Sequence, residues 1–284
     1  MPLAALNNQV VFKKLLSDEE ILKAFIKDFL NIDLQPETIE VEKKFVPPVG
    51  GVDIEIDIFV NDPVHRLVIE IQRERYDYNF DRFWHYHLIS QVELVKSHKL
   101  YKLECTVYTI VWLTRQIREK MYQRSLITTS QLSETEKGET LLLYPHKLFF
   151  LNPFYKNEQT PTGLIDWMEL VTESITNPQN PNINLSRPII QKAAKLIDDD
   201  GLTPQERVLI MDERDYENMR HREREDGRKA GWEEGRKEGQ EDGRLAEKRE
   251  TARKMLADGL ESVTIMKYTG LSREEFATLS STQD

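Results

Sequence analysis

Two short stretches that alternate apolar and acidic residues constrain the fold of this chain most strongly. The first, VDIEIDIFV at residues 52–60, gives an extended strand one apolar and one acidic face. The apolar face consists of Ile54, Ile56 and Ile58, and the acidic face of Asp53, Glu55 and Asp57. The second, RLVIEIQ at 66–72, places Leu67, Ile69 and Ile71 opposite Glu70 and Gln72. Residues 61–65, NDPVH, have turn composition, so the two stretches predict an antiparallel hairpin.

A turn between Asp62 and His65 sets the register of this hairpin. The predicted cross-strand pairs are Val60 with Leu67, Ile58 with Ile69, Asp57 with Glu70, and Glu55 with Gln72. Directly opposed residues have Cβ atoms about 4.5–5.5 Å apart, and two carboxylates at that distance repel unless a cation joins them or one is protonated. Oxygen ligands of this kind suit Mg²⁺, with Mn²⁺ or Ca²⁺ as alternatives. A solvated polar sheet face is the other interpretation, although residues 52–60 contain no lysine or threonine.

Periodic segments surround the hairpin. Residues 9–30 have helical spacing with a break at Ser17-Asp18, and residues 38–46 alternate as a strand. Residues 78–96 predict an amphipathic helix whose apolar face includes Trp84 and Leu88. The run CTVYTIVWL at 105–113 is apolar on both faces, as in a central strand. The order is therefore helix, strand, strand, strand, helix, strand, which indicates the α/β class.

The second half of the chain predicts peripheral and helical elements. ETLLLY (139–144) and KLFFL (147–151) are expected to form a peripheral strand pair, and GLIDWMELV (163–171) and RPIIQKAAKLI (187–197) are expected to form helices. A long helix is expected to start at Thr203, which begins a capping box with Glu206, and to run past residue 245.

Glycine recurs every four residues inside this long helix. The positions are Gly227, Gly231, Gly235, Gly239 and Gly243. Because each interior glycine costs about 1 kcal/mol relative to alanine, a compensating interaction is expected. A glycine stripe lets two helix backbones approach closely, so self-association through residues 227–243 is one interpretation and a frayed charged helix is the other.

The C-terminal residues predict two or three short helices. Stop signals lie at Asp258-Gly259 and Thr269-Gly270, and Ser272 with Glu275 forms a second capping box. The spacing is similar to a helix-turn-helix, but the stretch has few basic residues. A small helical interaction module therefore remains an equal alternative.

The order of elements, with Asp on the second strand and Glu-x-Gln on the third, resembles the PD-(D/E)XK nuclease superfamily. Residues 8–115 more narrowly resemble the Rpn (YhgA-like) family of recombination-promoting nucleases and transposase-like proteins. The likeness lies in the FKKLL–FLNIDL start, the DIFV–IEIQRE hairpin and the Arg82-x3-Tyr86 helix. The charged tail ending in TGLSREE is also similar to tails in that family.

The resemblance implies a restriction-endonuclease-like core (αβββαβ, a mixed central sheet flanked by helices) with a helical C-terminal extension. It implies that Asp57, Glu70 and Gln72 are catalytic. Asp57, Glu70 and the Ile71 carbonyl would bind the metal, with Glu55 as an additional candidate ligand. Gln72 stands where the catalytic lysine usually lies, and a neutral amide can only hydrogen-bond where an ammonium also stabilises charge. Asn8 stands where the family often has aspartate.

Basic residues follow the hairpin closely. Arg73 and Arg75 come directly after it and Arg82 lies on the next helix, so we expect them to contact the DNA backbone. Tyr86, one helical turn after Arg82, is a further candidate for the same cleft, and a residue that only caps the core is the alternative. His87 falls on the apolar side of its helix and is expected to be a core residue rather than a ligand.

These interpretations give four segments: residues 1–155 as nuclease core, 156–202 as its helical extension, 203–246 as the long charged helix and 247–284 as a helix-turn-helix-like tail. The predicted function is a Mg²⁺-dependent DNA endonuclease linked to recombination or mobile elements. The alternative is a catalytically inactive nuclease fold that assembles through its glycine-repeat helix.

Composition sets limits on this prediction. A net charge of −10 argues against indiscriminate coating of DNA. The single cysteine, Cys105, excludes a disulfide framework within the chain. No apolar stretch is long enough to span a membrane, so a cytoplasmic protein is expected.

Overall fold

The computed structural model describes residues 1–45, 54–73, 80–94, 105–117, 119–130 and 133–280. The chain divides into two compact units, residues 1–213 and 214–284. The first contains the predicted α/β core and the second is helical. Of the helices in the ranges just given, none is long and apolar enough to cross a membrane.

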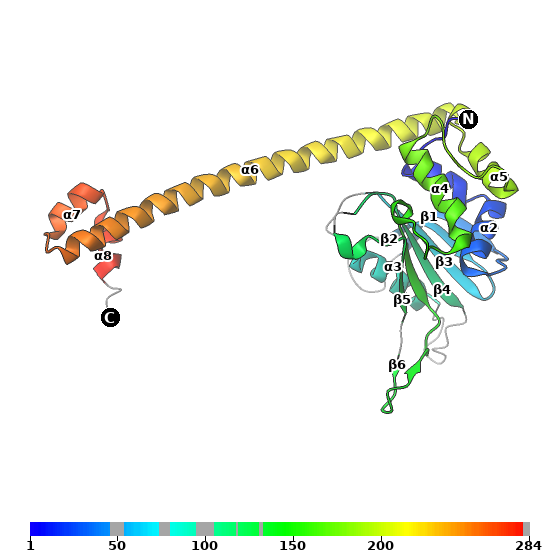
Figure 1. Ribbon diagram of the computed structural model, residues 1–284, viewed down its shortest axis with the longest axis horizontal. Helices are drawn as coiled ribbons and strands as arrows, with labels where there is room; N and C mark the ends of the chain where they lie inside the picture. Colours follow the sequence, from blue (N-terminus) through cyan, green and yellow to red (C-terminus); the bar gives the residue numbers. More distant parts are fainter. Residues whose placement is uncertain (46–53, 74–79, 95–104, 118, 131–132, 281–284) are drawn as a thin grey trace. The chain divides into compact units, whose positions relative to one another are not determined.

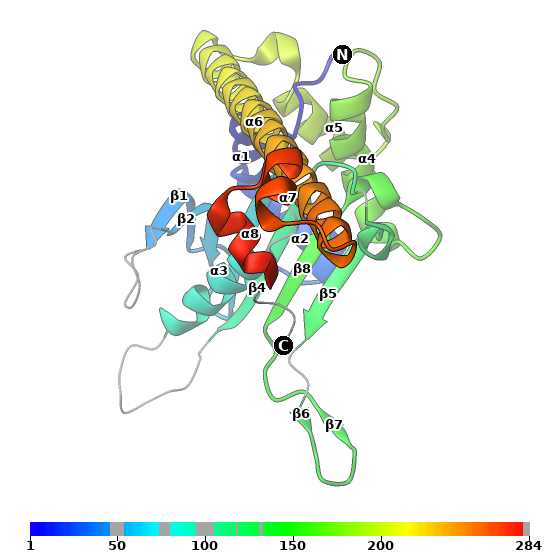
Figure 2. The ribbon, with the colours of Figure 1, turned by 90° about the vertical axis from the view of Figure 1, so that its left-hand side faces the viewer.

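The first unit is built around a six-stranded mixed sheet (Figure 1). Its strands lie in the order β1-β2-β3-β4-β8-β5. Their bounds are β1 Thr38–Phe45, β2 Ile54–Asn61, β3 His65–Gln72, β4 Thr106–Leu113, β5 Leu126–Ser130 and β8 Lys147–Leu151. Strands β3, β4 and β8 are parallel to one another, whereas β1, β2 and β5 pair antiparallel with their neighbours. Two short strands, β6 (Ser133–Glu134) and β7 (Thr140–Leu141), form a separate hairpin (Figure 2).

Helices cover both faces of the sheet. One face carries α1 (Gln9–Leu16), α2 (Glu19–Leu30), α4 (Thr162–Thr176) and α5 (Pro188–Leu196), and α3 (Asp81–Val92) lies on the other. Short 3₁₀ turns occur at Lys120–Tyr122, Pro153–Tyr155 and Asp199–Gly201. The break predicted at Ser17-Asp18 separates α1 from α2, and the order helix, strand, strand, strand, helix, strand is confirmed. The fold is a restriction-endonuclease-like α/β core with a helical C-terminal extension.

Strand β4 separates two apolar layers, as its sequence predicts. Ile110 and Trp112 pack into the layer under α1, α2, α4 and α5. Val111 and Leu113 pack into the layer under α3. Side chains alternate across a strand, so a strand buried on both faces must be apolar at every position.

The prediction that ETLLLY and KLFFL form a peripheral strand pair is wrong. KLFFL forms β8, an inner strand between β4 and β5, and Phe149 and Phe150 are buried on opposite faces. ETLLLY contributes only the short β7, and Leu141, Leu142 and Leu143 are exposed. The apolar composition of the two stretches is similar, so composition did not distinguish the inner strand from the exposed hairpin.

Helix α3 presents a face to the sheet that only partly matches the predicted one, since His87 is buried as predicted but Trp84 and Leu88 are not. Phe83, Tyr86 and His87 are buried, whereas Trp84 and Leu88 are exposed. Tyr86 and Ser90 can lie on the buried face of the helix because their polar side-chain atoms form hydrogen bonds there. The Tyr86 hydroxyl accepts from Arg82 Nε at 2.9 Å, and Ser90 Oγ donates to the Tyr86 carbonyl at 2.8 Å.

The long helix α6 (Pro204–Ala257) starts as its sequence predicts. The Thr203 N–H donates to Glu206 Oε2 at 2.8 Å, and the Glu206 N–H donates to Thr203 Oγ1 at 3.2 Å. This reciprocal pair satisfies two backbone donors that the first turn of a helix otherwise leaves without partners. The helix continues through the glycine repeat, and a Cβ added at any of those five glycines would meet no atom within 4 Å.

The second unit ends in two short helices, α7 (Ser262–Thr269) and α8 (Arg273–Ser280). Gly259 and Gly270 have positive φ, which supports the predicted helix stops. The Ser272–Glu275 capping box also forms, with bonds of 2.7 and 3.1 Å. Ala252, Ile265, Leu271 and Leu279 make a small apolar cluster.

Asp28 on α2 joins three helices. Its carboxylate accepts from Trp167 Nε1 of α4 at 2.7 Å and forms an ion pair with Arg187 beside α5. Its backbone carbonyl lies against Gly163, where an added Cβ would meet the carbonyl oxygen and lie 2.9 Å from the carbonyl carbon. Only a residue without a side chain allows α4 to approach α2 this closely.

We therefore predict that Gly163→Ala lowers the free energy of unfolding by about 1–3 kcal/mol, the usual cost of overpacking against an interior that cannot shift freely. Gly201→Ala is the control, because the nearest atom to its Cβ would be 3.9 Å away. Urea unfolding of the two variants measures the difference. Equal stability of the two would contradict the close approach of α2 and α4.

Candidate metal site

Asp57 lies at the point of strand β2 where the alternation of side chains between the two faces of the sheet changes. Ile54 and Ile56 pack in the layer under α3, but Ile58 packs in the opposite layer. The prediction that all three share a face is therefore wrong for Ile58. Neighbouring β1 is irregular at the same position, since Glu42 has φ 57° and the regular pairing skips it between Val41 with Ile58 and Lys43 with Ile56. A left-handed conformation is costly for a residue other than glycine, at about 1–3 kcal/mol.

The predicted hairpin register is confirmed on the side of the turn. Val60 is paired with Leu67, and Ile58 with Ile69. The regular backbone pairing of β2 and β3 stops there. Beyond it the two strands are joined by carboxylates: the Asp57 N–H donates to Glu70 Oε1 at 2.9 Å, and the Ile71 N–H donates to Asp57 Oδ2 at 3.0 Å. Each acid therefore accepts a hydrogen bond from the backbone of the opposite strand.

Both carboxylates are buried, Asp57 to 6% exposure and Glu70 to 1%. Burial, with the negative charge of Asp57 as the next contribution, raises the pKa of Glu70 well above its usual value. Desolvation and like charge both disfavour the ionised form. Two adjacent buried acids are thus an electrostatic arrangement that a cation would stabilise.

Helix α1 adds two residues that the sequence analysis did not select. Gln9 Nε2 donates to Asp57 Oδ1, and Lys13 Nζ lies 3.3 Å from the same oxygen. Lys13 Nζ also lies 2.9 Å from Glu42 Oε1. Gln9 and Lys13 are four residues apart and share a helix face, which was the available sequence signal. Asn8 caps this helix, with Oδ1 accepting from the Val10 N–H at 2.9 Å.

The other residues predicted for the metal site, Gln72, Ile71 and Glu55, differ in how they lie relative to Asp57 and Glu70. Gln72 is the last residue of β3, two positions after Glu70, and its carbonyl accepts from the Thr114 N–H at 3.1 Å. Ile71 meets the site through its N–H. Glu55 is half exposed, with its carboxylate 3.4 Å from Lys44 Nζ. The structure therefore does not bring Glu55 to Asp57 and Glu70. The alternation of side chains between the two sheet faces changes between Ile56 and Ile58.

Arg82 and Tyr86 reach the site from α3. Arg82 Nη2 lies 3.8 Å from Glu70 Oε2, and its guanidinium lies 5.2 Å from the centre of the Tyr86 ring. Burial raises the pKa of the Tyr86 hydroxyl, which keeps it a neutral hydrogen-bonding group. About half of the Arg82 side chain is exposed, so this guanidinium can meet a ligand from solvent.

The other two arginines that were predicted to contact DNA are Arg73 and Arg75. Arg73 forms an ion pair with Glu213 of α6. Glu213 also accepts from the Gln9 N–H at the start of α1, at 3.1 Å. Arg75 lies outside the residues that the structure describes. Arg82, 3.8 Å from Glu70, is thus the predicted cation that the described part of the chain places beside the acid pair.

The donor set fits a single hard cation. Within the described ranges, three or more His, Cys, Asp or Glu side chains do not come together as a metal-binding group. Two carboxylates are nevertheless a common protein contribution to a Mg²⁺ site, where water and substrate phosphates supply the other ligands. Glu70 Oε2, with Arg82 no nearer than 3.8 Å, and the lone pairs of Asp57 are the donors available to such an ion.

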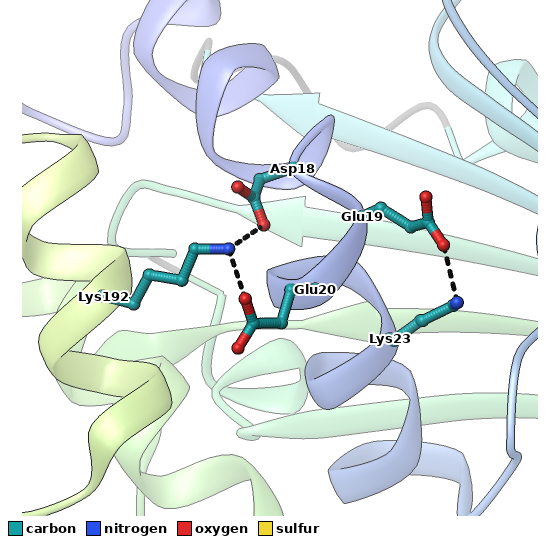
Figure 3. Close-up of a pocket in the computed structure, with 5 residues that line it drawn as sticks. All are labelled: Asp18, Glu19, Glu20, Lys23 and Lys192. Atoms are coloured by element: carbon teal, nitrogen blue, oxygen red, sulfur yellow. Dashed lines mark hydrogen bonds and ion pairs between the residues drawn. The ribbon is translucent and has the colours of Figure 1, made fainter.

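A surface hollow elsewhere in the unit is a different kind of feature (Figure 3). It is lined by Asp18, Glu19, Glu20, Lys23 and Lys192. Lys192 Nζ lies 2.8 Å from Asp18 and 2.7 Å from Glu20, and Lys23 lies 2.6 Å from Glu19. Each of the three acids is paired with one of the two lysines, and the hollow contains no residue of the acid pair.

Residues 245–281 match the family model for the C-terminal HTH domain of the Rpn/YhgA-like nuclease family. The C-terminal residues of the chain are therefore similar to that domain of the Rpn/YhgA-like nuclease family. No curated protein and no solved structure matched the chain.

His87 is a core residue, as predicted. It is 1% exposed, and its Nδ1 lies 2.9 Å from Thr109 Oγ1. Burial, with His146 as a second cause, lowers the pKa of His87 to about 4. The imidazole is therefore neutral in the folded protein at neutral pH.

We predict that His87 makes the fold sensitive to acid. The unfolded chain takes up a proton near pH 6.5 and the folded chain does not, so stability present above pH 6.5 is lost as the pH falls toward 4. The loss is up to about 3 kcal/mol. Urea unfolding at pH 7.5 and 4.5 should show a smaller loss for His87→Gln than for the wild type. The exposed His85 on the same helix provides the control His85→Gln, which should keep the wild-type loss. The same loss in all three proteins would contradict the assignment.

Proposed function

We propose that this protein is a divalent-metal-dependent DNA endonuclease that hydrolyses phosphodiester bonds. The reciprocal bonding of Asp57 and Glu70 at the end of the β2–β3 pairing carries the proposal. The match of residues 245–281 to a domain of a nuclease family agrees with it. Mg²⁺ is the expected ion, with Mn²⁺ or Ca²⁺ as alternatives. The association with recombination or mobile elements follows from the family resemblance.

Asp57 and Glu70 would hold the metal, with the Ile71 carbonyl as a third donor and Gln72 as a hydrogen-bonding neighbour. The bound metal would polarise a phosphoryl oxygen and lower the pKa of the attacking water. In the reaction a water oxygen bonds to phosphorus, the bond from phosphorus to one sugar oxygen breaks, and that oxygen takes a proton. The Ile71 N–H fixes Asp57 and the Asp57 N–H fixes Glu70, so neither acid can turn away.

Arg82 is the residue best placed to hold the DNA backbone at this site. Its guanidinium is half exposed beside Glu70 and is oriented by the Tyr86 hydroxyl at 2.9 Å. Guanidinium groups bind phosphate oxygens through paired hydrogen bonds. The C-terminal HTH-type domain, residues 245–281, would supply a second DNA contact.

The competing proposal is a catalytically inactive assembly protein. Its support is the open glycine repeat of residues 227–243, where a second copy of the helix could approach closely. The two proposals are not exclusive, since an active nuclease can also be a homo-oligomer through this stripe. They differ in whether the acid pair is needed for strand cleavage.

We predict that the purified protein nicks supercoiled plasmid DNA with Mg²⁺ or Mn²⁺ and that chelation stops the reaction. Asp57→Asn and Glu70→Gln should each reduce the rate about 100-fold or more, the range seen when one transition-state-stabilising group is removed. Glu19→Gln is the control, because that acid is exposed and pairs only with its helix neighbour Lys23 in the described structure.

Gel separation of nicked, linear and supercoiled plasmid provides the measurement. Failure of the wild type to cleave single- or double-stranded DNA with Mg²⁺, Mn²⁺ or Ca²⁺ would contradict the enzyme proposal and favour the assembly protein. Cleavage that persists in Asp57→Asn would locate the activity elsewhere.

A further inference from the structure

Lys13 is a buried cation aimed at the acid pair from the opposite side to Arg82. Its residue exposure is 7%, although lysine is rarely buried unless it is paired. Its ammonium lies 3.3 Å from Asp57 Oδ1 and 2.9 Å from Glu42 Oε1. Lys13 comes from α1, which packs on the other sheet face from α3.

The surroundings hold this ammonium in one place. Glu42 adopts the left-handed conformation, with φ 57°, at the point of β1 that faces Asp57. Strained backbone persists where the surrounding structure over-determines it and clusters at functional sites. Gln9, one turn earlier on α1, holds the same Asp57 oxygen. A lysine serving only as surface charge would need none of these contacts.

The proposed chemistry favours a cation beside the acid pair. Hydrolysis of a phosphodiester increases negative charge on the phosphoryl oxygens, and fixed donors in a buried site stabilise that charge strongly. Gln72, two residues after Glu70, carries a neutral amide and cannot supply a full positive charge. Arg82 approaches Glu70, which leaves the Asp57 side of the site to Lys13.

We infer that Lys13 is a catalytic residue of this site: its ammonium, delivered from α1, stabilises the phosphoryl group under attack and takes the role that Gln72 cannot perform. This inference rests on the proposed nuclease function. The ammonium acts as a hydrogen-bond donor throughout, and no proton leaves it. Asp57 holds it beside the reacting atoms, and Glu42 fixes the direction of approach.

The decisive test moves the positive charge. Lys13→Gln should cut DNA about 100-fold or more slowly than the wild type. The double variant Lys13→Gln/Gln72→Lys should recover at least ten-fold over Lys13→Gln, because residues 70 and 72 of a strand share a face. Lys14→Gln is the control, since that neighbour pairs with Glu206 at 2.8 Å, and it should keep the wild-type rate.

Calorimetric titration with Mn²⁺ gives a readout that does not depend on turnover. Lys13→Gln should bind Mn²⁺ at least as tightly as the wild type, because a cation beside Asp57 has been removed, whereas Asp57→Asn should bind it weakly. Weakened Mn²⁺ binding by a folded Lys13→Gln would indicate that the lysine only supports the structure of the acid pair, and would overturn the inference.

Other outcomes are equally informative. A folded Lys13→Gln that cleaves within about three-fold of the wild type overturns the inference and leaves the proposed function intact. If the wild type does not cleave DNA, the result contradicts the proposed function itself and not only the role of Lys13. If Lys13→Gln does not fold, Lys13→Arg keeps the ion pairs but replaces a compact ammonium by a planar group. Cleavage by Lys13→Arg at the wild-type rate would then overturn the inference.

Discussion

The exchange of carboxylate and backbone groups between Asp57 and Glu70 is the interaction on which the site depends. Two strands that part must leave backbone N–H groups without ladder partners, and a buried N–H without a partner costs about 1–3 kcal/mol. Here the acids accept those bonds, at 2.9 and 3.0 Å, so the strands separate without that cost. The same bonds fix two negative charges side by side in a buried place. Structural stability and the potential for metal chemistry therefore come from one arrangement.

The rest of the core can be understood as support for this arrangement. Helix α1 brings Gln9 and Lys13 to Asp57, and its own position is fixed by apolar residues that include Phe12 and Leu16. Helix α3 brings Arg82 to Glu70 through the buried pair Phe83 and Tyr86. Because the two helices lie on opposite faces of the sheet, positive charge reaches the acid pair from both sides. A polar site within an apolar sheet is tolerable only when its charges are compensated in this way.

The sequence predicted those parts of the fold that depend on local patterning. The register of the hairpin followed from alternation and turn composition, and both capping boxes followed from two-residue signals at Thr203 and Ser272. The change of face at Asp57 was beyond that reasoning. It coincides with the left-handed backbone of Glu42 in a neighbouring strand, and the alternation of Ile54, Ile56 and Ile58 continues in the sequence as if no change occurred. The three successive apolar residues 58–60 were the only local indication.

Long-range contacts explain why two residues of the candidate site, Gln9 and Lys13, were missed. Lys13 is separated from Asp57 by more than forty positions, and its spacing of four from Gln9 shows that the two share a helix face but not what that face contacts. The base of α6 provides a second example, since Glu213 meets both Arg73 and the first N–H of α1. Arg73 follows the acid pair in sequence and was expected to contact DNA, yet its charge is directed to α6. The start of the long helix is thereby tied to the helix that carries Gln9 and Lys13, so the position of these two residues depends on how α6 begins.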